Sequence, residues 1–224
     1  MDTIERIPTG IEGLDRILKG GIPRNFVVAV VGEPGTGKTI FCIHFIAQGL
    51  IVGEPGIYVT TEESRESIIK QAAMFGFNYK RHVDEGRLVI IDALSGLKTD
   101  PWSVDRLDVE ELISKVIEAK KYLGYGHTRV VIDSISALTF QVADPVERRL
   151  HTMLLFKTLL DAGCTSIIIS EAKTSQLERE FLFEEYLADG VIVLQNIYQE
   201  GNLVKCVYVE KLRGVSHDTQ PRPY

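Results

Sequence analysis

The hydrophobic positions of this chain form two patterns that alternate along the sequence. Five short runs of apolar, mostly β-branched residues show no polar alternation, which is typical of strands buried on both faces of a parallel sheet. Between them lie segments with a helical period, so we expect helices to cover both faces of the sheet. The predicted strands are residues 26–31, 57–61, 88–93, 130–132 and 166–170, and the predicted helices are residues 39–50, 64–75, 109–123 and 146–160.

The last third of the chain has a different pattern. Two longer apolar segments, residues 191–198 and 203–212, are joined by Gln199-Glu200-Gly201-Asn202, which is typical of a hairpin. We expect this hairpin to extend the edge of the parallel sheet in antiparallel orientation. Residues 217–224 contain two prolines and no periodic pattern, so we expect them to be irregular. No repeat or low-complexity run interrupts the chain, which predicts one α/β domain over residues 1–224.

Composition and charge narrow the class of protein. The 224 residues are 45% hydrophobic and 25% charged, which is typical of a soluble globular protein with a substantial core. The 25 basic and 31 acidic residues give a net charge of −6, which excludes a generally cationic nucleic-acid coat. No segment approaches the roughly 18 apolar residues of a membrane-spanning helix, and the start has no signal-peptide pattern. The scattered cysteines Cys42, Cys164 and Cys206 favour a cytoplasmic location and argue against a disulfide scaffold or a zinc site.

The strongest local motif follows the first predicted strand. The sequence Gly32-Glu33-Pro34-Gly35-Thr36-Gly37-Lys38-Thr39 fits the pattern G-x-x-x-x-G-K-[ST] at every fixed position, with a predicted strand before it and a helix after it. Glycines let the backbone N–H groups approach phosphate oxygens, and the helix N-terminus adds partial positive charge. We expect Lys38 to contact the β- and γ-phosphates of ATP and the Thr39 hydroxyl to bind Mg²⁺. Ile40, the next residue, is part of the same predicted nucleotide site.

A phosphate loop of this type needs a carboxylate for the metal ion. Asp133 follows the uncharged strand residues Val130-Val131-Ile132 and would lie at the carboxyl end of the sheet, facing the nucleotide crevice. We expect it to hold Mg²⁺ together with Thr39. The alternative interpretation of Asp133 is a helix cap.

Hydrolysis also needs a base for the attacking water. Glu62 and Glu63 come directly after the predicted strand 57–61, at the carboxyl end of the sheet. Glu62 is the candidate base and Glu63 its supporting neighbour. Both residues also suit the first turn of the following helix, where acidic side chains favour the helix dipole. Spacing alone leaves these two interpretations equal.

Together these residues resemble the RecA-like ATPases and, within them, the KaiC branch. The resemblance implies a RecA-like P-loop core with a mostly parallel sheet, and a single-domain relative of the RadA-paralogue type. It covers nearly the whole chain and is carried by PTGIEGLD (8–15), GGIPR (20–24), GEPGTGKT (32–39), TTEES (60–64), VDEGRLVIIDA (83–93), VVIDSISAL (130–138), EEYLADGVIVL (184–194) and EKLRGVSH (210–217).

The last of these segments is fairly specific to the branch. In KaiC-like proteins the K-x-R-G…H segment reaches across a ring interface to the neighbour's ATP phosphates. The resemblance therefore implies a homo-oligomer with ATP at the subunit interfaces, in which Lys211 and Arg213 act on the neighbour's ATP and His217 lies near the ribose. Such cations stabilise charge on the transferring phosphoryl group.

The resemblance also selects between the interpretations of the glutamates, because it implies that Glu62 and Glu63 are the catalytic pair. It places adenine near Met74-Phe75. Two departures from the family limit what it implies. KaiC proteins carry two such domains, of which the second phosphorylates itself, whereas residues 174–180 here lack the Ser/Thr pair at the corresponding place, so we expect ATPase and not autokinase activity. Family members usually continue beyond this point, so we expect a shortened or trimmed form.

Two functions of different class fit an ATPase of this kind. The first is a role in DNA recombination or repair, with single-stranded DNA or a recombinase as partner. The second is a nucleotide-dependent switch that assembles with proteins and does not bind DNA. By position, the DNA-facing loops would be residues 139–145 and 171–185, and the second carries two basic and five acidic residues, which repels phosphates. Arg148 and Arg149, and the basic spot Lys80-Arg81-His82, are the candidate DNA contacts.

Overall fold

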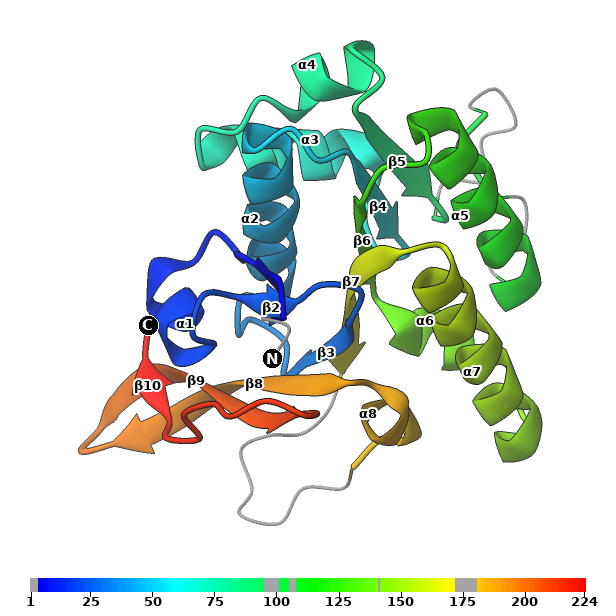
Figure 1. Cartoon of the computed structure of the whole chain (residues 1–224). Helices are drawn as coiled ribbons and strands as arrows, with labels where there is room; N and C mark the ends of the chain where they lie inside the picture. Colours follow the sequence, from blue (N-terminus) through cyan, green and yellow to red (C-terminus); the bar gives the residue numbers. More distant parts are fainter. Residues whose placement is uncertain (1–3, 95–100, 105–107, 141, 172–180) are drawn as a thin grey trace.

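The computed structural model describes residues 4–94, 101–104, 108–140, 142–171 and 181–224. Its centre is an eight-stranded sheet in the order β10-β9-β8-β3-β7-β6-β4-β5 (Figure 1). The strands are β3 (Val27–Gly32), β4 (Gly56–Thr60), β5 (Leu88–Asp92), β6 (Thr128–Asp133), β7 (Cys164–Glu171), β8 (Gly190–Gln199), β9 (Asn202–Leu212) and β10 (Arg222–Pro223), with a separate pair β1 (Arg6–Ile7) and β2 (Ile22–Pro23).

Helices cover both faces of this sheet (Figure 1). One face packs against α1 (Glu12–Ile17), α2 (Lys38–Ile51), α3 (Arg65–Met74) and α4 (Tyr79–Asp84). The other packs against α5 (Val109–Leu123), α6 (Ile135–Phe140), α7 (Pro145–Asp161) and α8 (Phe183–Leu187). Strand β3 explains the absence of polar alternation, because Val28 and Val30 enter the first core while Val27, Ala29 and Val31 enter the second.

The predicted fold class is confirmed. The strands β8, β3, β7, β6, β4 and β5 are parallel, and the hairpin partner β9 is antiparallel to β8. The predicted helices and strands are present with ends shifted by one or two residues. The short helices α1, α4, α6 and α8 were not predicted, because five or six residues are too few to show a helical period.

The prediction that residues 217–224 are irregular is wrong in one part. Arg222 and Pro223 form β10, which pairs with Val207 and Cys206 of β9. An edge strand offers unpaired backbone groups to any segment that passes it, and proline is tolerated there because its missing N–H can face away from the ladder. A periodic pattern cannot reveal a strand of two residues.

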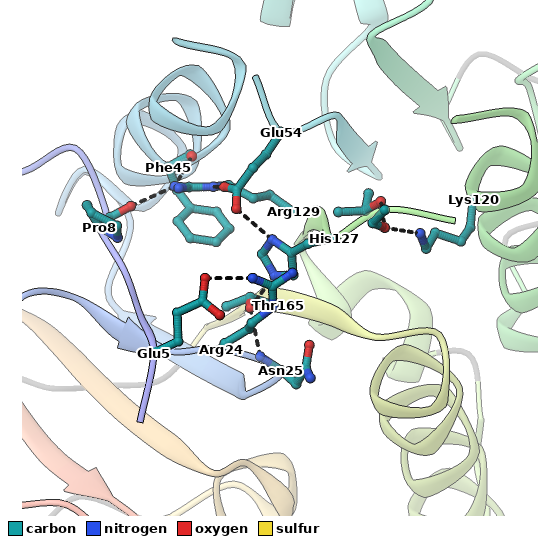
Figure 2. Close-up of polar contacts among 12 residues, drawn as sticks. Glu5, Pro8, Arg24, Asn25, Phe45, Glu54, Lys120, His127, Arg129 and Thr165 are labelled. Atoms are coloured by element: carbon teal, nitrogen blue, oxygen red, sulfur yellow. Dashed lines mark hydrogen bonds and ion pairs between the residues drawn. The ribbon is translucent and has the colours of Figure 1, made fainter. Parts of the chain in front are cut away.

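A polar network connects several segments near the end of the sheet where β4 and β6 begin (Figure 2). Arg129 is only 1% exposed, and its guanidinium donates to Glu54 Oε2 at 2.7 Å and to the carbonyls of Pro8 at 2.6 Å and Phe45 at 3.0 Å. His127 contacts the other oxygen of Glu54 at 2.8 Å. This buried cation therefore links β6 to α2, to the start of β4 and to the chain leading into α1.

Two further features bear on the class of protein. No helix in the part of the chain that the structure describes is both long and apolar enough to cross a membrane. The three cysteines are free and buried.

Candidate functional site

The loop between β3 and α2 has the backbone that a phosphate loop requires. Gly35 and Gly37 have φ angles of +77° and +91°, in the left-handed region that favours glycine. Gly32 has no room for a side chain, because a Cβ there would lie 2.6 Å from the Leu194 carbonyl oxygen and from Thr36 Oγ1. Gly37 precedes α2, and no side chain caps the helix. The N–H groups at the start of α2 therefore have no side-chain cap and can bind an anion.

Lys38 lies across this loop. Its side chain is buried, and its Nζ donates to the carbonyls of Gly32 at 2.9 Å and Glu33 at 3.1 Å. The carboxylate of Glu171, at the end of β7, is 4.0 Å from the same Nζ. These contacts fix the ammonium group beside the loop, where a phosphate would bind.

Asp133 lies at the carboxyl end of β6, as predicted, two residues before α6 begins. It accepts a hydrogen bond from the phenol of Tyr58 at 2.9 Å, and Thr39 lies near enough to affect its charge. Burial raises the pKa of Asp133, the charges of Glu62 and Glu63 raise it further, and the hydrogen bond from Tyr58 and the nearby Thr39 hydroxyl oppose this effect. Burial disfavours the charged form of this carboxylate, and a bound cation would stabilise that form.

The oxygen donors of Thr39 and Asp133 fit Mg²⁺, a hard cation that prefers oxygen ligands. Among the described residues, no group of three or more His, Cys, Asp and Glu side chains is arranged to hold a metal ion. At nucleotide sites Mg²⁺ is usually held by one or two protein oxygens plus substrate phosphates.

Glu62 and Glu63 reach the same cavity. Its volume is about 360 Å³, and its walls include Lys38, Thr39 and Asp133 as well as both glutamates. Glu62 is exposed and accepts from Ser134 Oγ at 2.9 Å. The first turn of α3 is capped by Ser64, which accepts from the N–H of Ser67, so neither glutamate is the cap. The structure thus brings the predicted metal, phosphate and base residues together in one place.

A second, apolar cavity of about 390 Å³ adjoins the first. The two cavities share Gly37, Ile40 and Lys205 as wall residues. The other side chains that line the apolar cavity include Ile11, Leu14, Phe41, His44, Leu194, Val207 and Tyr224. Its size and apolar walls suit a flat, aromatic ring next to the phosphate loop.

Sequence reasoning missed two residues at this junction. Lys205, near the start of β9, donates from Nζ to the Gly35 carbonyl at 2.6 Å. The Tyr224 hydroxyl donates to the Thr36 carbonyl, and burial raises the pKa of Tyr224 to about 12. Neither residue lies in a motif. The available signals were a lysine within a predicted strand and an aromatic residue in a segment that we expected to be irregular.

The structure does not bring Met74 and Phe75 into the wall of the apolar cavity. Met74 is 72% exposed and ends α3. The Phe75 ring lies 5.6 Å, centroid to centroid, from the His44 ring, and His44 does line the cavity. The predicted adenine region therefore lies beside the cavity, and Phe75 contacts it through His44.

Lys211 and Arg213 lie far from the phosphate loop of their own chain. Lys211 donates from Nζ to the carbonyls of Glu185 at 2.9 Å and Tyr186 at 3.1 Å, and Arg213 donates to the Tyr186 carbonyl at 2.8 Å. Both therefore contact the C-terminal end of α8. His217 is partly buried, and its Nε2 has no hydrogen-bond partner among the described residues.

The register of the sheet explains this separation. Leu212 is paired with Gly190, which in turn is level with Val28 near the start of β3, whereas the phosphate loop follows Gly32. Four residues of strand correspond to about 13 Å along the sheet, and two strand spacings add about 10 Å across it. An extended Arg213 side chain cannot cover that distance.

Several of the predicted DNA contacts are already bonded to other groups of the same chain. Residues 172–180 of the second loop lie outside the described residues. Arg148 folds back on the loop before α7, where its Nη2 donates to the Val142 carbonyl at 2.7 Å. Lys80 is ion-paired with Asp84, and Arg81 with Glu85. Phe140 is 87% exposed, so it does not pack in the core.

Comparisons with known proteins agree with this geometry. A family model described as the KaiC ATPase matches residues 7–224. A UPF0273 protein of Aeropyrum pernix is 37% identical over 227 residues, covering 99% of this chain and 90% of that protein. The circadian clock oscillator protein KaiC of Thermostichus vulcanus is also 37% identical, but the match spans only 42% of its length.

A solved structure is similar along the whole chain. The crystal structure of a KaiC-like protein from the hyperthermophilic archaeon Pyrococcus horikoshii superimposes with a TM-score of 0.83 at 30% identity, covering 99% of this chain and 94% of that one. The phosphate loop, the carboxylates at the ends of β4 and β6 and these matches lead to one assignment. This chain belongs to the KaiC family of RecA-like, nucleotide-binding ATPases.

Proposed function

We propose that this protein binds ATP with Mg²⁺ and hydrolyses it in the cavity at the carboxyl end of the sheet. One observation carries the proposal: the phosphate loop with Lys38, the side chains of Thr39 and Asp133, and the two glutamates line a single cavity of about 360 Å³. Residues 1–224 act as one domain in this proposal. We also propose a cytoplasmic location, because free cysteines are typical of a reducing compartment.

The two cavities divide ATP between them. The phosphates lie on the N–H groups of residues 32–39, and Lys38 contacts the β- and γ-phosphates. Adenine enters the apolar cavity between Ile40 and Tyr224, beside His44 and close to Phe75. Lys205 lines both cavities and neutralises phosphate charge between them.

Thr39 and Asp133 would hold the Mg²⁺ ion, with Tyr58 fixing the orientation of the Asp133 carboxylate. When bound, the ion neutralises charge on the phosphate oxygens. The residues of this chain carry out the rest of the reaction.

Glu62 acts as the general base. A water oxygen attacks the γ-phosphorus while a proton passes from that water to the Glu62 carboxylate. The bond from the γ-phosphorus to its bridging oxygen breaks, and ADP leaves with the electron pair. Lys38 and the N–H groups of the loop stabilise the charge on the transferring group. The hydrogen bond from Ser134 holds Glu62 at the wall of the cavity.

The proposal includes a homo-oligomer with ATP at the subunit interfaces. The positions of Lys211 and Arg213 support this, because they lie too far from the phosphate loop of their own chain to contact it. Acting on the neighbour's ATP, they complete the charge stabilisation, and the buried Nε2 of His217 gains a partner near the ribose. A head-to-tail contact of this kind builds rings or filaments.

ATP hydrolysis serves one of two functions. The first is DNA recombination or repair, and the second is a switch that controls protein assembly. The observation that favours the switch is the pairing of the candidate basic spot, since Asp84 and Glu85 neutralise Lys80 and Arg81. The net charge of −6 points the same way. The DNA function depends on Arg148 and Arg149.

The deciding experiment measures ATP turnover by the wild type, Lys38→Ala and Glu62→Gln, each with and without single-stranded DNA at low salt. We expect both variants to lose turnover by 100-fold or more, on the order of a lost general base or phosphate clamp. Wild-type turnover in either variant would refute the site. A DNA-stimulated rate that falls on Arg148→Ala/Arg149→Ala would establish the DNA function, and an unchanged rate favours the switch.

A further inference from the structure

The two adjacent glutamates of the site are held by different elements of the fold. Glu62 Oε1 accepts a hydrogen bond from Ser134 Oγ, at the end of β6, at 2.9 Å. Glu63 Oε2 accepts from Ser67 Oγ at 2.5 Å and from Gln71 Nε2, both on α3. One oxygen of each carboxylate is therefore held by neutral donors, one for Glu62 and two for Glu63.

Helix α3 presents these two donors on one face. Ser67 and Gln71 are four residues apart, and Gln71 Nε2 also lies 3.3 Å from Ser67 Oγ. A carboxylate only accepts hydrogen bonds, so the Gln71 amide must direct its nitrogen and not its oxygen toward Glu63. The backbone of Glu63 is held as well, because the Thr60 hydroxyl donates to its carbonyl at 2.7 Å.

The contacts that Ser67 and Gln71 make with Glu63 are separate from the cap of the helix. Ser64 caps the start of α3 by accepting from the N–H of Ser67. In the part of the chain that the structure describes, the side chains of Ser67 and Gln71 contact Glu63 and each other, and no N–H group of the first turn. Gln71 instead lines the cavity that contains Lys38 and both glutamates. The Gln71 amide is therefore directed toward Glu63 at the wall of this cavity.

The opposite oxygens of the two glutamates are available to a water molecule. Among the described residues, nothing donates to Glu62 Oε2 or to Glu63 Oε1. A water that donates one proton to each of these oxygens keeps a lone pair for the γ-phosphorus. This arrangement works only if Glu63 is held still, because a mobile second carboxylate would turn toward solvent or repel the phosphates.

We infer that Ser67 and Gln71 are positioning residues that fix Glu63 as the second acceptor for the attacking water. The inference rests on the proposed ATP hydrolysis and adds a specific task for α3. It differs from the general-base role of Glu62, because Ser67 and Gln71 act only through Glu63. The other ionisable groups that line the cavity are Lys38, Glu62, Asp133, Glu171 and Lys205.

The test is Gln71→Glu, compared with the wild type from pH 5.5 to 8.5. At high pH the introduced carboxylate repels Glu63, so we expect kcat to fall about tenfold or more, with KM for ATP within about twofold. Two adjacent carboxyl groups retain a shared proton as the pH falls. The protonated carboxyl can then donate to Glu63 as the amide did, and we expect kcat to recover to within about threefold of the wild type at pH 5.5.

Three comparisons complete the experiment. Gln71→Leu cannot donate at any pH, so its loss of kcat is expected to remain constant, and Ser67→Ala is expected to show a smaller constant loss. Ala73→Glu adds the same charge to an exposed position of α3 and is expected to match the wild type throughout. Wild-type kcat for Gln71→Leu, or a Gln71→Glu deficit that does not change with pH, would overturn the inference alone. A wild type without Lys38-dependent turnover would overturn the proposed function and this inference together.

Discussion

The phenol of Tyr58 donates a hydrogen bond to Oδ2 of Asp133 at 2.9 Å inside the core below the phosphate loop. Tyr58 is fully buried in the middle of β4, and Asp133 ends the neighbouring strand β6. The bond occupies one carboxylate oxygen and restricts the rotation of the Asp133 carboxylate beside Thr39. Sequence patterns show Tyr58 only as another core residue.

Tyr58→Phe removes this donor while keeping the ring. Because outer-shell hydrogen bonds orient metal ligands, we expect the affinity of the ATP complex for Mg²⁺ to weaken about tenfold. The measurement is a calorimetric titration of the metal ion into protein saturated with ATP. Tyr79→Phe is the matched control, since Tyr79 is also buried and donates to a carbonyl of α2, that of Ile43, at 2.6 Å. Equal metal affinities for the two variants would contradict the role of Tyr58.

Mixing two inactive variants tests whether Arg213 acts on the neighbouring subunit. Lys38→Ala lacks a working phosphate loop, and Arg213→Ala lacks a cation, but each retains what the other has lost. In mixed oligomers about a quarter of the interfaces combine an intact loop with an intact Arg213, so we expect turnover near that fraction of the wild-type rate. Turnover is followed by phosphate release at several protein concentrations.

The mixing experiment also needs a control variant that is not expected to affect turnover. Arg24→Ala removes an arginine that is ion-paired with Glu5, away from the phosphate loop, and its turnover is expected to stay at the wild-type level. A mixture that only sums the residual rates of its two components would show that Arg213 does not act on the neighbour's ATP.

Gly49 of α2 has no room for a side chain. A Cβ there would lie 2.5 Å from Arg129 Cδ and 2.6 Å from its Nε. Gly49→Ala is therefore expected to lower the free energy of unfolding by about 2 kcal/mol, the usual cost of overpacking, although alanine ordinarily favours a helix. Gly13→Ala in α1 meets no atom within 4 Å and is expected to raise stability by about 0.5 kcal/mol. Urea unfolding measures both, and a stabilised Gly49→Ala would refute the tight contact.

Glu54 links pH to stability through the network of Figure 2. Burial alone would raise the pKa of Glu54, but the hydrogen bonds from His127 and Arg129 outweigh it and lower the pKa to about 2. Because the folded pKa is below the ordinary value of 4.5, the stabilisation is complete above pH 4.5. It is lost as the pH falls toward 2, since the unfolded chain takes up the proton first.

Glu54→Gln removes this titration and leaves Arg129 buried without its carboxylate. At pH 7 we expect a loss of about 3 kcal/mol in the free energy of unfolding, and the difference from the wild type is expected to shrink between pH 4.5 and pH 2.5. Urea unfolding across this range measures it. Glu118→Gln breaks an exposed pair with Lys115 and is expected to change stability by less than about 0.5 kcal/mol. If the free energies of unfolding of the wild type and Glu54→Gln fell by the same amount between pH 4.5 and pH 2.5, the prediction would be contradicted.

The sequence by itself determined the framework of the protein. Unbroken β-branched runs require burial on both faces, which leaves a parallel sheet covered by helices as the solution. The spacing of Gly32, Gly37, Lys38 and Thr39 places a phosphate loop after the first of these strands, because the chemistry depends on residues that are adjacent in the chain. Glu62 and Asp133 follow from their places at strand ends, since parallel strands end at one edge of a sheet.

The tertiary structure alone decided which distant residues meet at that edge. Lys205 and Tyr224 reach the loop because β9 and β10 extend the sheet past β8, a pairing that local patterns do not encode. Tyr58 meets Asp133 only because β4 lies next to β6, although α3, α4, β5 and α5 separate them in the chain. Register also separated Arg213 from its own phosphate loop. Hydrogen bonds act over about 3 Å, so contacts between distant segments depend on strand order and register, which no single stretch of sequence specifies.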